Sequence, residues 1–328
     1  MKILQSSNFS DFRNFFRAKL EKFFLVPADT FDNVKGQFPI GFFIWDAAKK
    51  EIFKEEVGDI YNKNEIHIGT KTIFTYDNYK YINNWYSKFY DNKGSEIGVM
   101  NTRGNDFQNQ NYIRVSSDNN FNHTNIITVN NLIESSIYYT VRHCIEANWL
   151  NDRDQFLYPN SGWEKDREFQ NDCLAYTLFN NNIQSKYGTN NWIPFTEYEV
   201  GARDKFDSNF MTNFIAGKTE QSIVAEPSLF DKSKPARTMP LKFSTEAKNV
   251  FATGKALWKY YHKQPDCNIN ASLYDIREHF QGRNDKGRMN AKSDDESYMK
   301  LIKSLREQLH NLAIKIQPKV YTYGFLKV

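Results

Sequence analysis

Apolar residues in the first fifty positions follow two different patterns. Between residues 9 and 24 they recur at steps of three and four, which predicts an amphipathic helix with Ser10 as its N-cap. The positions are Phe12, Phe15, Phe16, Leu20, Phe23 and Phe24. After Pro27 and a turn, PIGFFIWD (39–46) is apolar on both faces, which is typical of a strand in the middle of a sheet. A helix followed by such a strand predicts part of a layered α/β domain.

The middle of the chain alternates over shorter distances. Strands are predicted at 71–77, 97–100, 112–115 and 125–129, separated by clusters of Asn, Asp and Gly that favour turns. One short helix is predicted between Tyr81 and Phe89, and a longer one after Asn131, with Glu134 completing a capping box. Residues 151–240 look irregular, with short helices at 167–179 and 205–216 and an extended, proline-containing linker at 225–240.

The last part of the chain has helical periodicity. Helices are predicted around 250–261 and 273–280, and a third from Ser293, with Glu296 as capping-box partner, to Pro318. The pattern as a whole predicts a mixed α/β (α+β) protein with three regions: 1–50, a mixed middle region at 51–240 and a helical region at 241–328.

Composition places the chain among globular proteins of the cytoplasm. Of its 328 residues 40% are hydrophobic and 25% are charged, which is enough for a packed core and excludes a disordered chain. The net charge of +4 permits contact with a polyanion without requiring it. The 3 cysteines are far apart, which favours inert thiols in a reducing compartment. A polar N-terminal stretch and the lack of a long apolar run predict neither secretion nor a membrane span.

Catalytic motifs are sparse. No glycine-rich nucleotide-binding turn and no serine nucleophile elbow occurs. The densest reactive set is His143, Cys144, Glu146 and residues 152–154, for which ordinary pairing is a better explanation than acid/base or metal chemistry. A metal-dependent nuclease would use Glu246 and Lys248 with Asp231, although Glu246 is also favoured simply by the start of a helix.

Two polar loops are candidates for contact with nucleic acid, because amides and arginines read base edges and hold phosphates. In TRGNDFQNQN (102–111) the candidates are Arg103, Asn105, Gln108 and Gln110. In QGRNDKGRMNAK (281–292) they are Arg283, Lys286, Arg288 and Lys292. The alternative for each loop is an ordinary polar turn, packed on itself or solvated.

Four blocks of the chain resemble the downstream region of N6-adenine DNA methyltransferases from restriction-modification systems. They are residues 12–46, which include FPIGFFIW, and residues 104–113, 130–160 and 270–290. The resemblance implies that residues 1–50 are the last helix and strand of a Rossmann-like methyltransferase sheet. It implies further that 51–240 takes part in target recognition and that double-stranded DNA is a partner.

The chain lacks the motifs with which this family binds its cofactor and its target base. The family binds S-adenosylmethionine through a glycine-containing loop and holds the flipped adenine with an Asn/Asp-Pro-Pro-aromatic motif. Neither is present, and none of the 9 prolines adjoins another. No catalytic, cofactor or metal residue is therefore assigned, and S-adenosylmethionine is expected only with an upstream methyltransferase half or another restriction-modification subunit. A metal-dependent restriction nuclease and a non-catalytic interaction module remain the alternatives.

Overall fold

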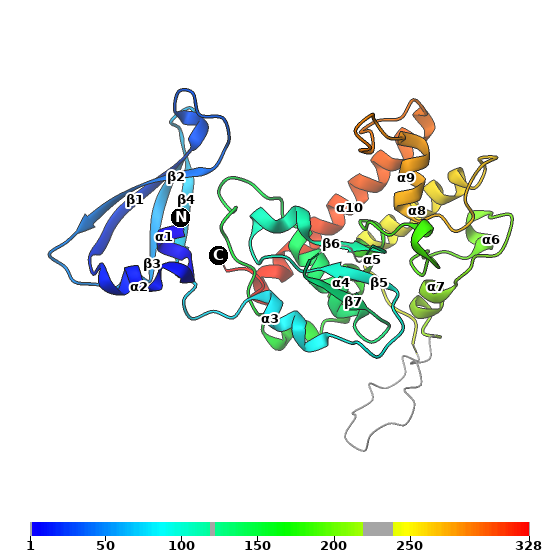
Figure 1. Ribbon diagram of the computed structural model, residues 1–328, viewed down its shortest axis with the longest axis horizontal. Helices are drawn as coiled ribbons and strands as arrows, with labels where there is room; N and C mark the ends of the chain where they lie inside the picture. The colour runs from blue at the N-terminus through cyan, green and yellow to red at the C-terminus, as the bar shows by residue number, and fades with distance from the viewer. Residues whose placement is uncertain (1, 119–121, 219–238, 328) are drawn as a thin grey trace, which may run out of the picture.

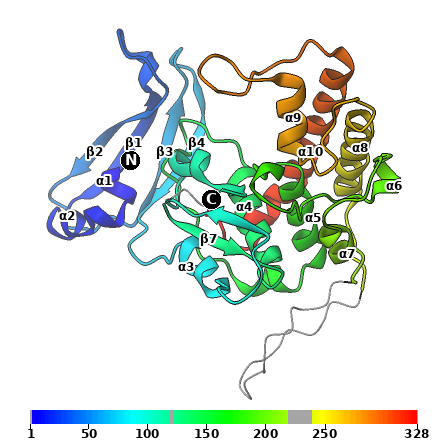
Figure 2. The same ribbon diagram turned by 45° about the vertical axis from the view of Figure 1, so that its right-hand side comes forward.

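The chain forms a small N-terminal sheet joined to a larger mixed body. The computed structural model describes residues 2–118, 122–218 and 239–327, and Figures 1 and 2 show the sheet on one side with the long C-terminal helices on the other. The N-terminal part contains α1 (Lys2–Gln5), α2 (Ser10–Phe15), β1 (Lys19–Pro27), β2 (Pro39–Asp46), β3 (Glu55–Tyr61) and β4 (His67–Phe74). Within the described residues, no helix is long and apolar enough to cross a membrane.

The body combines a second sheet with helices. Its strands are β5 (Gly98–Asn101), β6 (Arg114–Ser116) and β7 (Thr124–Ile127), in the order β6-β5-β7, all antiparallel. Its α-helices are α3 (Ile82–Tyr86), α4 (Leu132–His143), α5 (Arg167–Leu178), α6 (Glu197–Val200), α7 (Phe210–Ile215), α8 (Thr245–Tyr261), α9 (Leu273–Gln281) and α10 (Glu296–Thr322). Two sheets combined with these helices confirm the predicted mixed α/β class.

The N-terminal sheet has the strand order β2-β1-β3-β4, which leaves β2 at an edge. β2 pairs with β1 in antiparallel register from Lys19↔Asp46 to Pro27↔Pro39, and β1 pairs in parallel with β3. The expectation of a central, doubly buried strand at 39–46 is therefore wrong, because none of the strands in the described residues lies on the outer side of β2 and none of its side chains is fully buried. The expected regional boundary at residue 50 falls inside this sheet, between β2 and β3.

The expected helix over residues 9–24 is also corrected. Only Ser10–Phe15 is helical, and residues 19–27 form β1. The register of β1 against β2 shifts between Leu20 and Lys22, which is a bulge at Glu21. A bulge adds one residue to a strand, so Leu20 and Phe23, three positions apart, are both buried on the inner face. That spacing of three is what imitated a helix.

One face of the N-terminal sheet is packed and also joins it to the body. Phe23, Leu25, Ile60 and Ile73 form its core with Leu4 of α1, and the apolar side chains of residues 149–150 of the body pack against them. At the same junction Lys71 of β4 donates hydrogen bonds to the Asp154 carboxylate at 2.8 and 3.0 Å. Both side chains are largely buried, so the sheet is held to the body by apolar packing and by one sheltered ion pair.

Helix ends in the body differ from the expected caps in three places. Asn131 makes no side-chain cap on α4; its Oδ1 accepts from the Thr128 amide and its Nδ2 donates to two carbonyls of the preceding chain. α10 is capped by Asp295 rather than Ser293, and it continues through Pro318 to Thr322. The expected strand at 112–115 begins at Arg114, because residues 107–112 form a 3-10 helix, and the expected helix at 205–216 is confined to α7.

Candidate nucleic-acid interface

The first candidate loop, 102–111, is shaped from beneath by a buried cation. Arg142 of α4 is fully buried and donates to the Gly104 carbonyl at 3.0 Å and to the Asp106 carbonyl at 2.9 Å. Its guanidinium also lies over the Phe156 ring, 4.8 Å from the centroid. Because a guanidinium has several donors in a fixed fork, it can hold two successive turns of backbone at once. The conformation of the loop therefore depends on one residue outside it.

Two of the four predicted contact residues of this loop serve its own structure. Gln110 donates from Nε2 to the carbonyls of Arg142 and Ile145 at 2.6 and 3.1 Å, and the Asn105 Oδ1 accepts from a backbone amide of α3. Gln108 is exposed, although its amide donates to Asp152 at 2.9 Å. Arg103 is exposed, and its guanidinium lies 4.4 Å from the centroid of the Tyr112 ring. Arg103 is thus the member of this set best placed to meet a ligand.

The second candidate loop, 281–292, is a turn organised by Arg283. This side chain donates to the Glu278 carboxylate, to the Gly287 carbonyl at 2.7 Å and to the Tyr274 hydroxyl at 3.2 Å. The hydrogen bond that Arg283 donates to Glu278 is the main cause that raises the pKa of Arg283. Lys286, Arg288 and Lys292 are exposed around this turn. Arg283 therefore shapes the loop, and the other three cations remain available at its surface.

The dense reactive set at 143–154 does not converge on one point. His143 Nε2 bonds to the Ile113 carbonyl at 2.9 Å, and burial lowers the pKa of His143 to about 4. Burial likewise raises the pKa of the Cys144 thiol to about 12, while Asp154 faces Lys71. No group of three or more metal-binding side chains occurs within residues 2–118, 122–218 and 239–327. His143 and Cys144 are therefore buried packing residues, and Asp154 helps to hold the sheet to the body.

The nuclease alternative has a simple local structure. Glu246 lies in the first turn of α8, where Ser244 caps the helix by accepting from the Ala247 amide at 3.1 Å. Lys248, two positions after Glu246, is exposed, and Asp231 lies outside the described residues. A carboxylate in the first turn of a helix is favoured by the helix dipole, which accounts for Glu246 without a metal.

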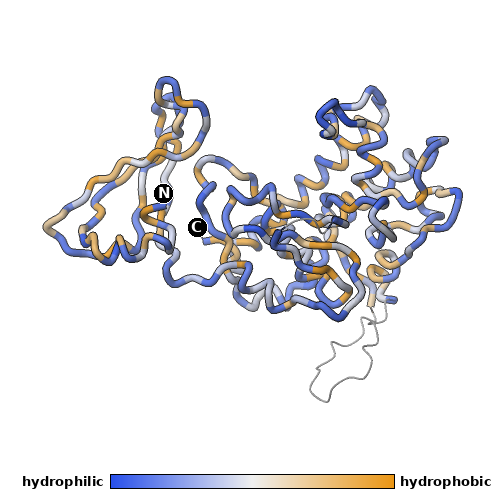
Figure 3. The backbone as a smooth tube through the Cα atoms, in the orientation of Figure 1, coloured by the Kyte–Doolittle hydropathy of each residue, from blue (hydrophilic) through white to orange (hydrophobic). Residues whose placement is uncertain are grey.

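The second face of the N-terminal sheet is open and carries exposed apolar side chains beside charged ones. Phe42 and Ile44 of β2 and Val57 of β3 share this face by register and are 41–60% exposed. On the same face Lys22 forms an ion pair with Asp59 at 3.0 Å. Phe24 of β1 stacks on Phe42 with ring centroids 4.7 Å apart. Figure 3 shows the hydrophobic residues that run along these strands. Exposed apolar side chains grouped along an edge strand are a feature of surfaces for contact.

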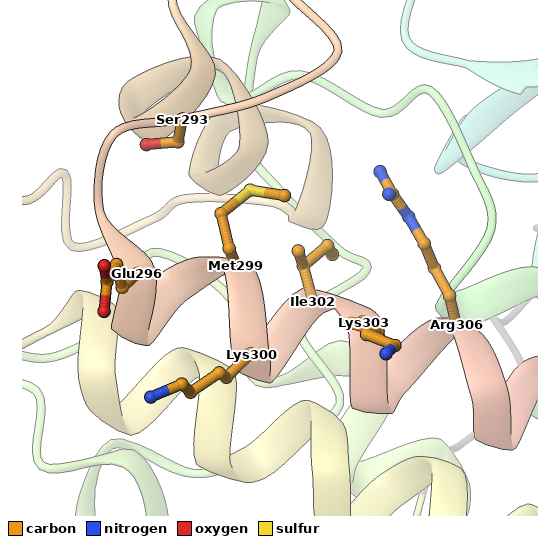
Figure 4. A pocket seen from close by; sticks show the side chains of 7 residues that line it. All are labelled: Ser293, Glu296, Met299, Lys300, Ile302, Lys303 and Arg306. Carbon is orange, nitrogen blue, oxygen red and sulfur yellow. The ribbon is translucent and has the colours of Figure 1, made fainter.

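Sequence reasoning missed a basic face on α10. Met299, Ile302 and Arg306 extend on one side of the helix and, with Ser293, line a cavity of about 430 Å³ (Figure 4). Lys300 and Lys303 also line it, and Glu296 at its end is its only acidic member. A signal was present: residues 297–306 contain three cations at steps of three and no carboxylate. It was overlooked because the same stretch carries the apolar stripe of the helix.

Comparison with known proteins adds no relative. No family model, no curated protein and no solved structure matches the chain.

Proposed function

We propose that this chain is the downstream part of an adenine-specific DNA methyltransferase of a restriction-modification system. In this role it completes a sheet with an upstream catalytic half, contacts duplex DNA and transfers no methyl group by itself. The upstream half supplies the S-adenosylmethionine site and the adenine pocket. The observation that carries the proposal is the open edge of the N-terminal sheet with the exposed apolar side chains of β2, together with the family resemblance of residues 12–46.

The edge strand lacks the usual protection against pairing. Apart from Asp46 at its end, β2 has no charged residue, and its one proline is the first residue. Isolated edges normally carry lysines, internal prolines or a covering segment, because free backbone N–H and C=O groups recruit other strands. An added strand beside β2 would pair these groups. The same partner would cover the exposed side chains of Phe42 and Ile44, as helices cover the sheets of α/β domains.

Contact with DNA is supported by the exposed cations of the body. Arg103 lies over Tyr112, and Lys286, Arg288 and Lys292 surround the turn that Arg283 organises. Lysines and arginines on projecting loops neutralise backbone phosphates and set the orientation of a protein on the duplex. We assign these residues to positioning on DNA, and the adenine chemistry to the upstream half.

The test is methyl transfer from S-adenosylmethionine to adenine in duplex DNA. The chain is assayed alone, then with the methyltransferase half encoded upstream of it. We expect no transfer by the chain alone and transfer by the pair. Ile44→Glu should abolish transfer and association with that half, because it places a charge on the docking face. The new carboxylate lies opposite Lys22, so it introduces no like-charge repulsion within the sheet. Ile314→Glu, at a similarly exposed position of α10, is the matched control.

The opposite outcomes are equally clear. Methyl transfer by the chain alone would require a cofactor site within it and would overturn the proposed division of labour. A pair that associates and methylates equally well with Ile44→Glu would show that the open sheet face is not the docking surface.

A further inference from the structure

Arg277 of α9 is a partly buried cation without a counter-charge. Its Nε atom is buried and has no hydrogen-bond partner, and no carboxylate of the described residues forms an ion pair with it. Burial lowers the pKa of Arg277, but an arginine side chain keeps its proton under all ordinary conditions. A sheltered charge with no partner costs free energy in the folded protein. Such a cost is expected where a ligand of opposite charge completes the site.

A second guanidinium increases this cost. Arg306 of α10 lies close enough to Arg277 for charge repulsion to contribute, after burial, to the lowered pKa of Arg277. Both guanidiniums also act on the phenol of Tyr298, whose pKa burial raises to about 12. The two arginines belong to different helices, which are joined through residues 282–295. Arg306 also lines the cavity of Figure 4 together with Lys300 and Lys303, where Glu296 is the only carboxylate of the lining. The cations that line this cavity outnumber its carboxylate, which suits an anion.

The cations continue along α10 in a row. Lys300, Lys303 and Arg306 follow each other at steps of three, with no carboxylate between Glu296 and Glu307. At about 1.5 Å rise per residue, the row covers about 9 Å of helix axis. One strand of DNA carries a phosphate about every 3.4 Å along its axis, so the row spans more than one phosphate. A line of cations suits a polyanion better than it suits a single small anion.

We propose that Arg277 and Arg306, with Lys300 and Lys303, bind consecutive backbone phosphates of duplex DNA. The ligand chemistry stands on these residues alone, whereas its assignment to DNA rests on the proposed function. Arginines hold phosphate oxygens through forked charge-assisted hydrogen bonds, and the lysines act as point charges beside them. Contacts of this kind carry no sequence information, so base recognition belongs to other residues.

The experiment is a salt titration of the affinity of the full chain for a fluorescent duplex, followed by anisotropy. We expect Arg306→Gln, at an exposed position, to raise the Kd for the duplex about tenfold, the effect of losing one charged hydrogen bond. It should also lower the slope of log K against log salt by about one. Arg17→Gln, which removes an exposed arginine of the N-terminal part, is the control and should change neither quantity.

Arg277→Gln separates a ligand site from a structural role. If Arg277 binds a phosphate and has no structural role, Arg277→Gln should bind DNA more weakly than the wild type. Without DNA, its melting temperature should equal or exceed that of the wild type. A structural arginine would instead lower the melting temperature. Affinities and slopes of both variants that equal the wild type would overturn the proposal. A second result would also overturn it: inorganic phosphate raises the melting temperature of the wild type but of neither variant, while both variants bind DNA like the wild type. The ligand of the site would then be a free anion and not DNA.

Failure of this inference is distinguishable from failure of the proposed function. The anisotropy experiment needs no upstream half, whereas methyl transfer does. DNA binding that is weakened about tenfold in Arg306→Gln, with no methylation by the pair, would support the phosphate site and reject the methyltransferase assignment.

Discussion

Replacing Arg142 by Met tests whether one buried guanidinium determines the shape of loop 102–111. Two carbonyls, of Gly104 and Asp106, lose their charged donor. A buried carbonyl without a donor costs about 1–3 kcal/mol. Both carbonyls keep a weaker partner at 3.4 Å, Gly104 in the Asn83 side-chain amide and Asp106 in the Asn109 backbone amide, and the Arg142 Nε has no partner in the native fold. Both facts reduce the loss, so we expect a net decrease of about 2–3 kcal/mol in the free energy of unfolding.

The assay combines urea unfolding with hydrogen exchange of the amides of residues 103–113. Exchange in this loop should accelerate by at least about tenfold, because 1.4 kcal/mol corresponds to a factor of ten. Arg142→Lys is the control: it keeps the charge but cannot reach both carbonyls with a fork, so its effect should be intermediate. The reasoning would be refuted if loop exchange stayed at the wild-type rate and stability changed by less than about 0.5 kcal/mol, the level of an ordinary surface substitution.

Two further predictions concern stability. The pKa of His143 is lowered to about 4 from 6.5, so between these values the unfolded chain binds a proton that the folded chain does not. The stability this provides is complete above about pH 6.5 and is lost as the pH falls toward 4; urea unfolding at pH 7 and pH 5 should show a smaller decrease for His143→Gln than for the wild type. Lys71→Met should destabilise the protein by about 2–4 kcal/mol, because Asp154 is left sheltered and unpaired. Adding Asp154→Asn should restore part of that loss, and strict additivity in the double-mutant cycle would contradict a direct interaction.

The sequence predicted best those elements whose periodicity is set by one covered face. α5, α8 and α9 lie close to the expected positions, because their buried residues recur with the helical repeat. β1 was misassigned since its bulge at Glu21 hides the alternation. β2 was predicted in the middle of a sheet because both of its faces are apolar. Apolar faces show that a strand is suited to contacts on both sides, but among the described residues β2 has a neighbouring strand, β1, on one side only. Pro318 did not end α10 where the rule expected.

The candidate site was predictable only in part. Exposed cations on polar loops could be read from composition, and Arg103 and Lys286 are indeed at the surface. The hydrogen bonds of Gln110 within the protein could not be predicted, because its acceptors are carbonyls more than thirty positions away. The stacking of Phe280 of α9 on Tyr298 of α10, with ring centroids 4.4 Å apart, brings the cations of the two helices into one region, and no local pattern encodes it. The pattern of a single segment does not predict which polar groups from distant parts of the chain lie together.

The aromatic cluster around Trp85 has a consequence for the order of folding. Phe325, fully buried, lies edge-on to Trp85 with ring centroids 5.4 Å apart, and its carbonyl accepts from the Leu157 amide at 2.8 Å. Nearby, Lys327 and Glu55 join positions separated by 272 residues. Contacts of such large sequence separation form slowly, because the loop they close must first lose its entropy. A nascent chain that has emerged only as far as α8 still lacks the residue that seals Trp85, so its aromatic surface is open to chaperones until α10 and the residues after it have been synthesised.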